Sequence, residues 1–203
     1  MMMSFFITMY IKMRKNSLIK YKIFSKALMT LCILSVTNNI VNADTNILKD
    51  TVYEKVGIQE NVDPYLLYSI SLVESAKAKK SKETTLVAPH KYAIRTPRGA
   101  IYPKTYFEAV EVLDRELKTY SPKSIDIGLM QINGQHFSRV ASPAELLKPD
   151  VNVKVACDIL KTAMDSYPGN KTIGIGRYHS FTDWRARAYG SRVIAVYKNL
   201  KGQ

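Results

Sequence analysis

Beyond residue 46, most of the chain repeats its apolar residues every three or four positions. This is the period of an α-helix that buries one face, so we expect a mainly helical protein. The predicted helices cover 47–56, 61–76, 105–120, 142–167, 171–180 and 183–200, and a short separate turn opens the fourth of them.

The ends of the first two predicted helices carry recognisable signals. Asp63 is a good N-cap, because its carboxylate can accept hydrogen bonds from free backbone N–H groups, and Pro64 suits the first helical position. Gly57 suits the left-handed backbone that closes many helices, so we expect the first helix to end there. The second helix is therefore predicted to start anew at Asp63.

The same period predicts which helix faces are buried. In the helix over 105–120, the expected buried face consists of Phe107, Val110, Leu113 and Leu117. In the last helix, which starts at Asp183, the expected buried residues are Tyr189, Val193, Val196, Tyr197 and Leu200.

Three segments depart from the helical period. Short strand-like runs flank Pro97, Arg98 and Gly99, which predicts a β-hairpin. Residues 121–137 follow neither period, and we expect a structured loop with a helical turn there. The polar residues 77–85 predict no helix or strand.

The first 43 residues have a different composition. They contain six basic residues, no acidic residue, an apolar run over 27–36 and small residues before Ala43. This is the layout of a secretory signal peptide, and the apolar run is shorter than the about 20 residues that cross a bilayer. We therefore expect export to the periplasm, removal of residues 1–43 and one domain over 44–203. An uncleaved segment, which would tether the protein to the membrane, is the alternative. The basic cluster also favours a translation start at Met13.

Charge narrows the classes of partner. The chain carries 30 basic and 17 acidic residues; without the predicted signal peptide 24 basic residues remain, and the net charge is +7. A positive protein favours polyanionic surroundings such as a cell wall or a membrane surface. The sequence lacks a basic–aromatic pattern, so nucleic acid is not an expected partner, and membrane contact is expected only through the signal segment.

The sequence contains no metal or cofactor motif. The histidines His90, His136 and His179 lie far apart and lack the spacing of metal ligands. Neither a glycine-rich phosphate loop nor a Ser-His-Asp pattern is present. Cys157 is the one cysteine left after residue 43, so no internal disulfide is expected and its thiol is predicted to pack in a core. We therefore expect chemistry that requires no cofactor.

One acidic residue stands out by its position. Glu74 lies four residues after Ile70, at the edge of the apolar stripe of its helix. A carboxyl group held against apolar neighbours is harder to ionise, so it can keep a proton near neutral pH and donate it to a leaving oxygen. Position alone also fits a glutamate that ends a helix in solvent.

Four segments in a fixed order resemble the SLT-type lytic transglycosylases, which share the goose-type lysozyme fold. The segments are VDPYLLYSISLVES, IDIGLMQIN, LLKPDVNVKVACDIL and IGRYHS, and the likeness spans roughly Val52 to Tyr197. It implies a mainly α (α+β, lysozyme-like) fold, in which a helical bundle surrounds a glycan groove and the β-hairpin is a small insert. The insert and the Tyr-His-Ser ending most resemble versions carried by conjugative elements and type IV secretion systems, which implies partners in such machinery.

The resemblance implies roles for individual residues. Glu74 takes the place of the single catalytic acid, and Gln131 and Asn133 match positions that line the glycan groove. Gly128 matches a glycine that lets the backbone run close to the sugar. Tyr178 matches a tyrosine that hydrogen-bonds towards the catalytic carboxyl. For the last four residues, packing or turn geometry is the alternative role.

The sequence also departs from the family pattern. Many members follow the Glu-Ser pair with an aromatic residue and Asn-Pro, whereas this chain has AKAKKSKE, and Tyr178-His179-Ser180 stands where Tyr-Asn-Ala-Gly is commoner. The first departure leaves open which residue, if any, the loop after Glu74 contributes to the groove.

The implied reaction cuts the β-1,4 bond between N-acetylmuramic acid (MurNAc) and N-acetylglucosamine (GlcNAc) in peptidoglycan and leaves a 1,6-anhydro-MurNAc end. Glu74 alone can serve as acid and then as base, because the attacking hydroxyl belongs to the same sugar. A hydrolytic muramidase with Asp126 as second carboxylate remains an alternative. A non-catalytic wall-binding assembly factor is another.

Overall fold

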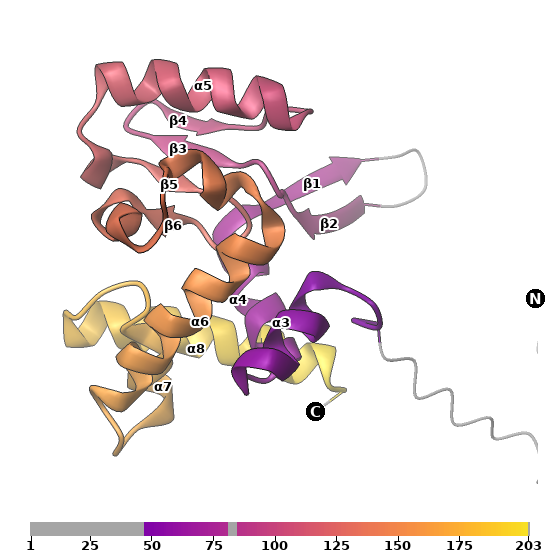
Figure 1. The fold of residues 1–203 in the computed structure, drawn as a ribbon. Helices are drawn as coiled ribbons and strands as arrows, with labels where there is room; N and C mark the ends of the chain where they lie inside the picture. The colour runs from indigo at the N-terminus through magenta and orange to yellow at the C-terminus, as the bar shows by residue number, and fades with distance from the viewer. Residues whose placement is uncertain (1–46, 81–84, 203) are drawn as a thin grey trace, which may run out of the picture. The chain divides into compact units, whose positions relative to one another are not determined.

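The computed structural model of the protein describes residues 47–80 and 85–202 (Figure 1). The predicted signal peptide over 1–43 and the predicted start at Met13 lie outside the described residues. The α-helices are α3 (Val52–Glu60), α4 (Pro64–Ser75), α5 (Tyr106–Thr119), α6 (Pro149–Asp165), α7 (Lys171–Gly176) and α8 (Asp183–Leu200). The 3-10 helices are η1 (Pro122–Ser124), η2 (Gly134–Arg139) and η3 (Pro143–Leu147). The strands are β1 (Ala76–Lys80), β2 (Thr85–Pro89), β3 (Ile94–Thr96), β4 (Gly99–Ile101), β5 (Asp126–Ile127) and β6 (Ile132–Asn133).

Helices α3, α4, α6, α7 and α8 form one packed group, whereas α5 packs against β3 and η3. Helix α4 packs against α3 and α8, while α6 packs against α3 and α7, and α7 packs against α8 (Figure 1). Their buried faces meet through fully enclosed side chains such as Leu67, Leu160 and Tyr189. Burying one such side chain stabilises the fold by about 1.5–3 kcal/mol. The predicted mainly helical fold is confirmed, and no described helix is long and apolar enough to cross a membrane.

The start of α4 is as predicted, but the end of α3 is not. The Asp63 carboxylate accepts a hydrogen bond from the Tyr65 N–H at 2.8 Å, and Pro64 is the first residue of α4. Helix α3 continues past Gly57 and ends at Glu60, and Asn61, with φ of 53°, is the left-handed residue that closes it. Asn61 can take this role because its short polar side chain tolerates the left-handed region.

Helix α5 is one residue shorter at each end than the predicted helix over 105–120, and it is rotated relative to the predicted face. Phe107 is 80% exposed, whereas Leu113 is buried as expected. The residues of α5 that are buried are Ala109, Val112, Leu113 and Glu116. The prediction was wrong for Phe107 because an apolar residue in the first turn can project past the end of the surface that its helix covers.

The predicted hairpin is confirmed and is part of a larger sheet. Strands β3 and β4 pair on either side of Pro97 and Arg98, and β5 and β6 extend the sheet in the order β4-β3-β5-β6. Both added strands come from the segment 121–137, which was predicted to be a loop. Each has two residues, too few to show the alternation by which strands are recognised.

A second two-stranded sheet was not predicted. The polar segment after α4 forms β1, which pairs with β2 in antiparallel register from Ala76 opposite Pro89 to Lys80 opposite Thr85 (Figure 1). Lysine is depleted in strands, so the composition of this segment argued against the fold that it adopts.

The register of the four-stranded sheet separates two kinds of side chain. Ile94, Ile127 and Ile132 lie opposite one another across β3, β5 and β6 and are at most 1% exposed. The adjacent positions Arg95, Asp126 and Asn133 also lie opposite one another. Because neighbouring residues of a strand point to opposite faces, this second row faces away from the isoleucine core.

Candidate active site

A cavity of about 360 Å³ opens between the helices and the polar face of this sheet. Five of the predicted site residues line it together: Glu74, Asp126, Gln131, Asn133 and Tyr178. Arg95, His136 and His179 also line it. Gly128 is not among its lining residues.

Glu74 is held at the end of α4 by its neighbours. It is half-buried and is the second-last residue of the helix. The hydroxyl of the buried Ser75 donates to the carbonyl oxygen of Leu129, at 2.7 Å, and is 3.2 Å from that of Ser71. An Arg95 guanidinium nitrogen (Nη2) donates to the backbone oxygen of Glu74 at 3.3 Å. These contacts fix the point where the chain leaves the helix, and with it the backbone that carries the Glu74 side chain.

The Glu74 carboxyl is hard to ionise in this position. Burial raises the pKa of Glu74 to about 7. The nearby Tyr189 hydroxyl and the charges of Arg95 and Arg192 lower this pKa, and the charge of Asp126 raises it. A carboxyl group with a pKa near the working pH is present in both the acid and the base form, which suits proton transfer in either direction. The direction of the shift agrees with the expectation from its place in the sequence.

Two tyrosines lie beside this carboxyl, and they have different partners. The Tyr178 hydroxyl donates to the Met130 carbonyl oxygen at 2.8 Å, so the hydrogen bond towards Glu74 that the family resemblance implied is not formed. Tyr189 of α8 is 1% exposed, and its hydroxyl lowers the pKa of Glu74. This hydroxyl lies near the carboxyl group but does not meet the geometric criteria of a hydrogen bond with any described residue. The His179 ring stacks on the Tyr189 ring at a centroid distance of 4.8 Å.

The second carboxyl of the cavity is held by a direct hydrogen bond. The Asn133 amide nitrogen donates to Asp126 Oδ1 at 2.8 Å and to the Lys123 carbonyl oxygen at 2.9 Å. The Asn133 amide oxygen accepts from the Gln135 N–H at 3.1 Å. Burial raises the pKa of Asp126, while Asn133 and the charge of Arg95 lower it. Asn133 thus lines the cavity, and its amide group is engaged in fixing Asp126 and the start of η2.

Gln131 has an unusual backbone and a tethered side chain. Its φ of 47° is left-handed, which costs about 1–3 kcal/mol for a residue other than glycine. Its side-chain nitrogen donates to the carbonyl oxygens of Ala93, at 3.1 Å, and Gly128, at 3.0 Å. These hydrogen bonds engage the amide nitrogen, so the carbonyl oxygen is the part of this cavity-lining side chain that can accept from a ligand.

Gly128 has a packing role, and its predicted contact with sugar stays a prediction. Its φ is 80°, and a Cβ there would overlap the amide of Asn152 and approach the Leu146 carbonyl oxygen to 2.8 Å. The buried Asn152 joins this turn to α6: it accepts from the Met130 N–H at 2.9 Å and donates to the Ile127 carbonyl oxygen at 2.9 Å. A glycine is therefore required to let the Asn152 side chain reach the backbone.

Tyr189 and Asn152 were both missed as parts of the site. Tyr189 was predicted to be a buried residue of the last helix. The apolar period does not show that its hydroxyl lies near the carboxyl group of Glu74, which is far away in the sequence. Asn152 is 1% exposed in the middle of a helical pattern. A lone asparagine at a buried helix position was the available signal, because a buried amide needs hydrogen-bond partners.

The histidines of the chain do not form a metal site in the part of the chain that the structure describes. No group of three or more histidine, cysteine, aspartate or glutamate side chains there is placed to hold a metal ion. His136 and His179 line the cavity, and burial lowers the pKa of both.

Comparison with known proteins agrees with this geometry. A family model described as "Transglycosylase SLT domain" matches residues 52–191, which include every residue of the cavity. A comparison with curated protein sequences gave no significant match.

Proposed function

Because the chain belongs to the SLT-type lytic transglycosylases, glycosidic-bond lyases that act on peptidoglycan, we propose that Glu74 is its single catalytic acid and base. The observation that carries this proposal is the position of the Glu74 side chain, which lines the cavity at the end of α4, where burial raises its pKa to about 7. Such a group can donate a proton and take one back within a single catalytic cycle.

The proposed reaction has two proton transfers. Protonated Glu74 donates to the oxygen that links C1 of MurNAc to GlcNAc, and the C1–O bond breaks. The Glu74 carboxylate then removes the proton from the C6 hydroxyl of the same MurNAc, whose oxygen bonds to C1. Glu74 ends protonated, and the products are a free GlcNAc hydroxyl and a 1,6-anhydro-MurNAc end. No water is consumed, and the intramolecular attack supplies much of the rate.

A hydrolytic muramidase is the second candidate function, since Asp126 lines the same cavity. Hydrolysis requires a second carboxylate that positions or activates water. The hydrogen bond from Asn133 and the charge of Arg95 favour the ionised form of Asp126 and also engage it. We favour a role in which Asp126 stays charged and stabilises the positive centre at C1. A non-catalytic assembly factor has less support, because it would not need a carboxyl group poised near neutral pH.

The product decides between these reactions. Purified peptidoglycan sacculi are digested with the protein, and the released fragments are weighed by mass spectrometry. Anhydro fragments, one water lighter than hydrolytic ones, are expected. Reducing ends in place of anhydro ends would establish the muramidase, and no release by a folded protein would favour the assembly factor.

We propose further that the protein acts in the periplasm and opens the wall locally for a conjugation or secretion apparatus. The support is the signal-like composition of residues 1–43 and the likeness of the hairpin and of Tyr178-His179-Ser180 to versions from such systems. N-terminal sequencing of protein recovered from the periplasm should begin at Asp44. Recovery of the full segment in the membrane fraction would favour a tethered form.

A further inference from the structure

One arginine connects the two elements that carry the carboxyl groups of the cavity. Arg95 lies in β3, directly opposite Asp126 of β5, and both side chains line the cavity. Residues directly opposite each other in antiparallel strands have Cβ atoms about 4.5–5.5 Å apart. From this place the Arg95 side chain reaches α4, where its Nη2 donates to the Glu74 backbone oxygen at 3.3 Å. Arg95 therefore spans the distance from the neighbour of Asp126 to the residue proposed as the catalytic acid.

The contact with α4 is made at the helix end that favours a cation. The last four carbonyl groups of an α-helix have no partner within the helix, and their partial negative charge attracts a positive group. Helix α4 has no basic residue in its last turn, and Ala76 after it is extended. The Ser75 carbonyl oxygen accepts from the His90 N–H at 3.1 Å, and the Glu74 carbonyl oxygen accepts from Arg95. Arg95 thus supplies from β3 the cation that the helix itself lacks.

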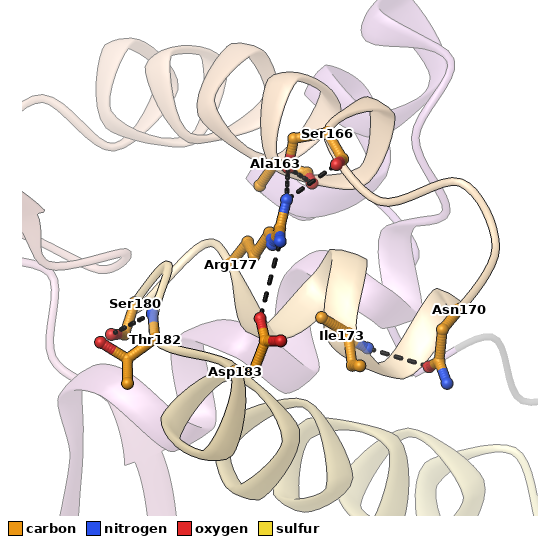
Figure 2. A network of polar contacts seen from close by, with 8 residues as sticks. All are labelled: Ala163, Ser166, Asn170, Ile173, Arg177, Ser180, Thr182 and Asp183. Atoms are coloured by element: carbon orange, nitrogen blue, oxygen red, sulfur yellow. Dashed lines mark hydrogen bonds and ion pairs between the residues drawn. The ribbon is translucent and has the colours of Figure 1, made fainter.

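The charge of Arg95 is not paired with a carboxylate of any residue that the structure describes. Arg177, which precedes Tyr178 in the chain, is different. It donates to the Ser166 backbone oxygen at 2.7 Å and lies 3.6 Å from a carboxylate oxygen of Asp183 (Figure 2). Arg177 thus joins the end of α6 to the start of α8, and its charge is balanced there. The charge of Arg95 remains available to act on the cavity.

Several charged or titratable groups face Glu74. They come from α8, β5, β3 and the segment after α7, and they are Tyr189, Arg192, Asp126, Arg95 and Tyr178. Burial raises the pKa of both Glu74 and Asp126, and the positive charge of Arg95 lowers both. A fixed cation beside an acid favours the carboxylate that forms when the acid gives up its proton.

We propose that Arg95 is a positioning residue, which fixes the end of α4 against the sheet and holds a cation beside both carboxyl groups of the cavity. The proposal rests on the proposed function, because it gives Arg95 a part in the proton transfers of Glu74. When Glu74 donates its proton to the glycosidic oxygen, it becomes a carboxylate, which Arg95 stabilises. When Glu74 takes the proton from the C6 hydroxyl, it is neutral again. Arg95 stays charged throughout, since arginine does not titrate in proteins.

Titration of Glu74 in variants of Arg95 tests this role without any turnover. Protein labelled with ¹³C at the glutamate carboxyl groups is followed by NMR, and the signal missing from Glu74→Gln identifies the residue. Arg95→Gln should raise the midpoint of Glu74 by about 0.2–0.7 pH unit, the effect of a partly exposed charge. Arg95→Met also lacks the charge and should repeat the shift. Arg95→Lys keeps the charge and should retain the wild-type midpoint.

Digestion of soluble peptidoglycan strands gives the second readout. Both charge-free variants should lower kcat and leave KM unchanged, because Arg95 acts through Glu74 and not on the sugar. They should also move the alkaline fall of kcat/KM to higher pH, since Glu74 then keeps its proton to higher pH. Arg95→Lys should restore the wild-type pH profile. Thermal unfolding checks that each variant is folded.

Arg98→Gln is the matched control, because Arg98 is exposed in the same hairpin, carries the same charge and does not line the cavity. It should change neither the midpoint nor KM. An unchanged midpoint in Arg95→Gln and Arg95→Met would overturn the proposal, as would an equal shift in Arg98→Gln. A higher KM without a shift would show contact with the glycan and overturn it too. Wild-type protein that cuts no strands would refute the proposed function, whereas the midpoints would still decide whether Arg95 acts on Glu74.

Discussion

The cavity at Glu74 has two walls that hold their carboxyl groups in different ways. The helical wall is the end of α4, and the sheet wall is formed by β5 and β6. On the helical wall, burial raises the pKa of Glu74 to about 7, and the nearby Tyr189 hydroxyl lowers it. On the sheet wall, Asp126 accepts a direct hydrogen bond from Asn133 beside Arg95. This difference supports the proposed roles, in which Glu74 carries a proton that can move and Asp126 keeps a fixed charge.

Loss of the helical carboxyl should have the largest effect. Glu74→Gln keeps the shape of the side chain but can neither donate nor accept the proton, so turnover should fall by about 10³-fold or more. Clearing of purified sacculi measures the loss, and thermal unfolding checks that the variant is folded. Glu111→Gln, at an exposed position of α5, is the control and should retain activity. Full clearing by folded Glu74→Gln would assign the chemistry to another residue.

A change in the turn between β5 and β6 should destabilise the sheet wall. Gly128→Ala combines a φ of 80° with an overlap between the new Cβ and Asn152. We expect a loss of about 2–4 kcal/mol in the free energy of unfolding, with activity lost in parallel. Urea denaturation measures it. A stable but inactive variant would instead support direct contact between Gly128 and the glycan.

Variants of the two tyrosines near Glu74 should have different effects, one on stability and the other on proton transfer. Tyr178→Phe leaves the Met130 carbonyl oxygen without its donor and should cost about 1–3 kcal/mol of stability. Tyr189→Phe removes a hydroxyl that lowers the pKa of Glu74, so that pKa should rise. In the proposed reaction the acid form of Glu74 acts first, so the alkaline fall of kcat/KM should then move to higher pH. A shift of the pH profile with Tyr178→Phe but not with Tyr189→Phe would identify Tyr178 as the partner of Glu74.

The smallest change is expected on the sheet wall itself. Asp126→Asn removes a negative charge that raises the pKa of Glu74, so the alkaline fall of kcat/KM should move to lower pH. Activity should fall less than in Glu74→Gln, because Glu74, the proposed proton carrier, is retained. The products should still be anhydro fragments. Complete loss of turnover would favour the muramidase.

Much of the helical wall could be predicted from the sequence. Asp63 and Pro64 mark the start of α4, and the helical period places Glu74 at the edge of its apolar stripe. These are local features, because an N-cap and a helical period depend on residues a few positions apart.

The sheet wall and the contacts across the cavity could not be predicted in the same way. Asp126 and Asn133 lie in two-residue strands, and their alignment with Arg95 depends on a register that no local pattern encodes. The place of Tyr189 beside Glu74 depends on the packing of α8 against α4, two helices far apart in the chain. The contact between Gly128 and Asn152 likewise depends on the packing of α6 against this turn.

Titration of Glu74 itself tests most directly whether its carboxyl holds a proton near neutral pH. Protein labelled with ¹³C at the glutamate carboxyl groups is followed by NMR from acid to alkaline pH, and the signal missing from Glu74→Gln identifies the residue. A midpoint near 7 is expected. A midpoint near 4.5, the ordinary value for glutamate, would contradict the role of Glu74 as the acid of this site.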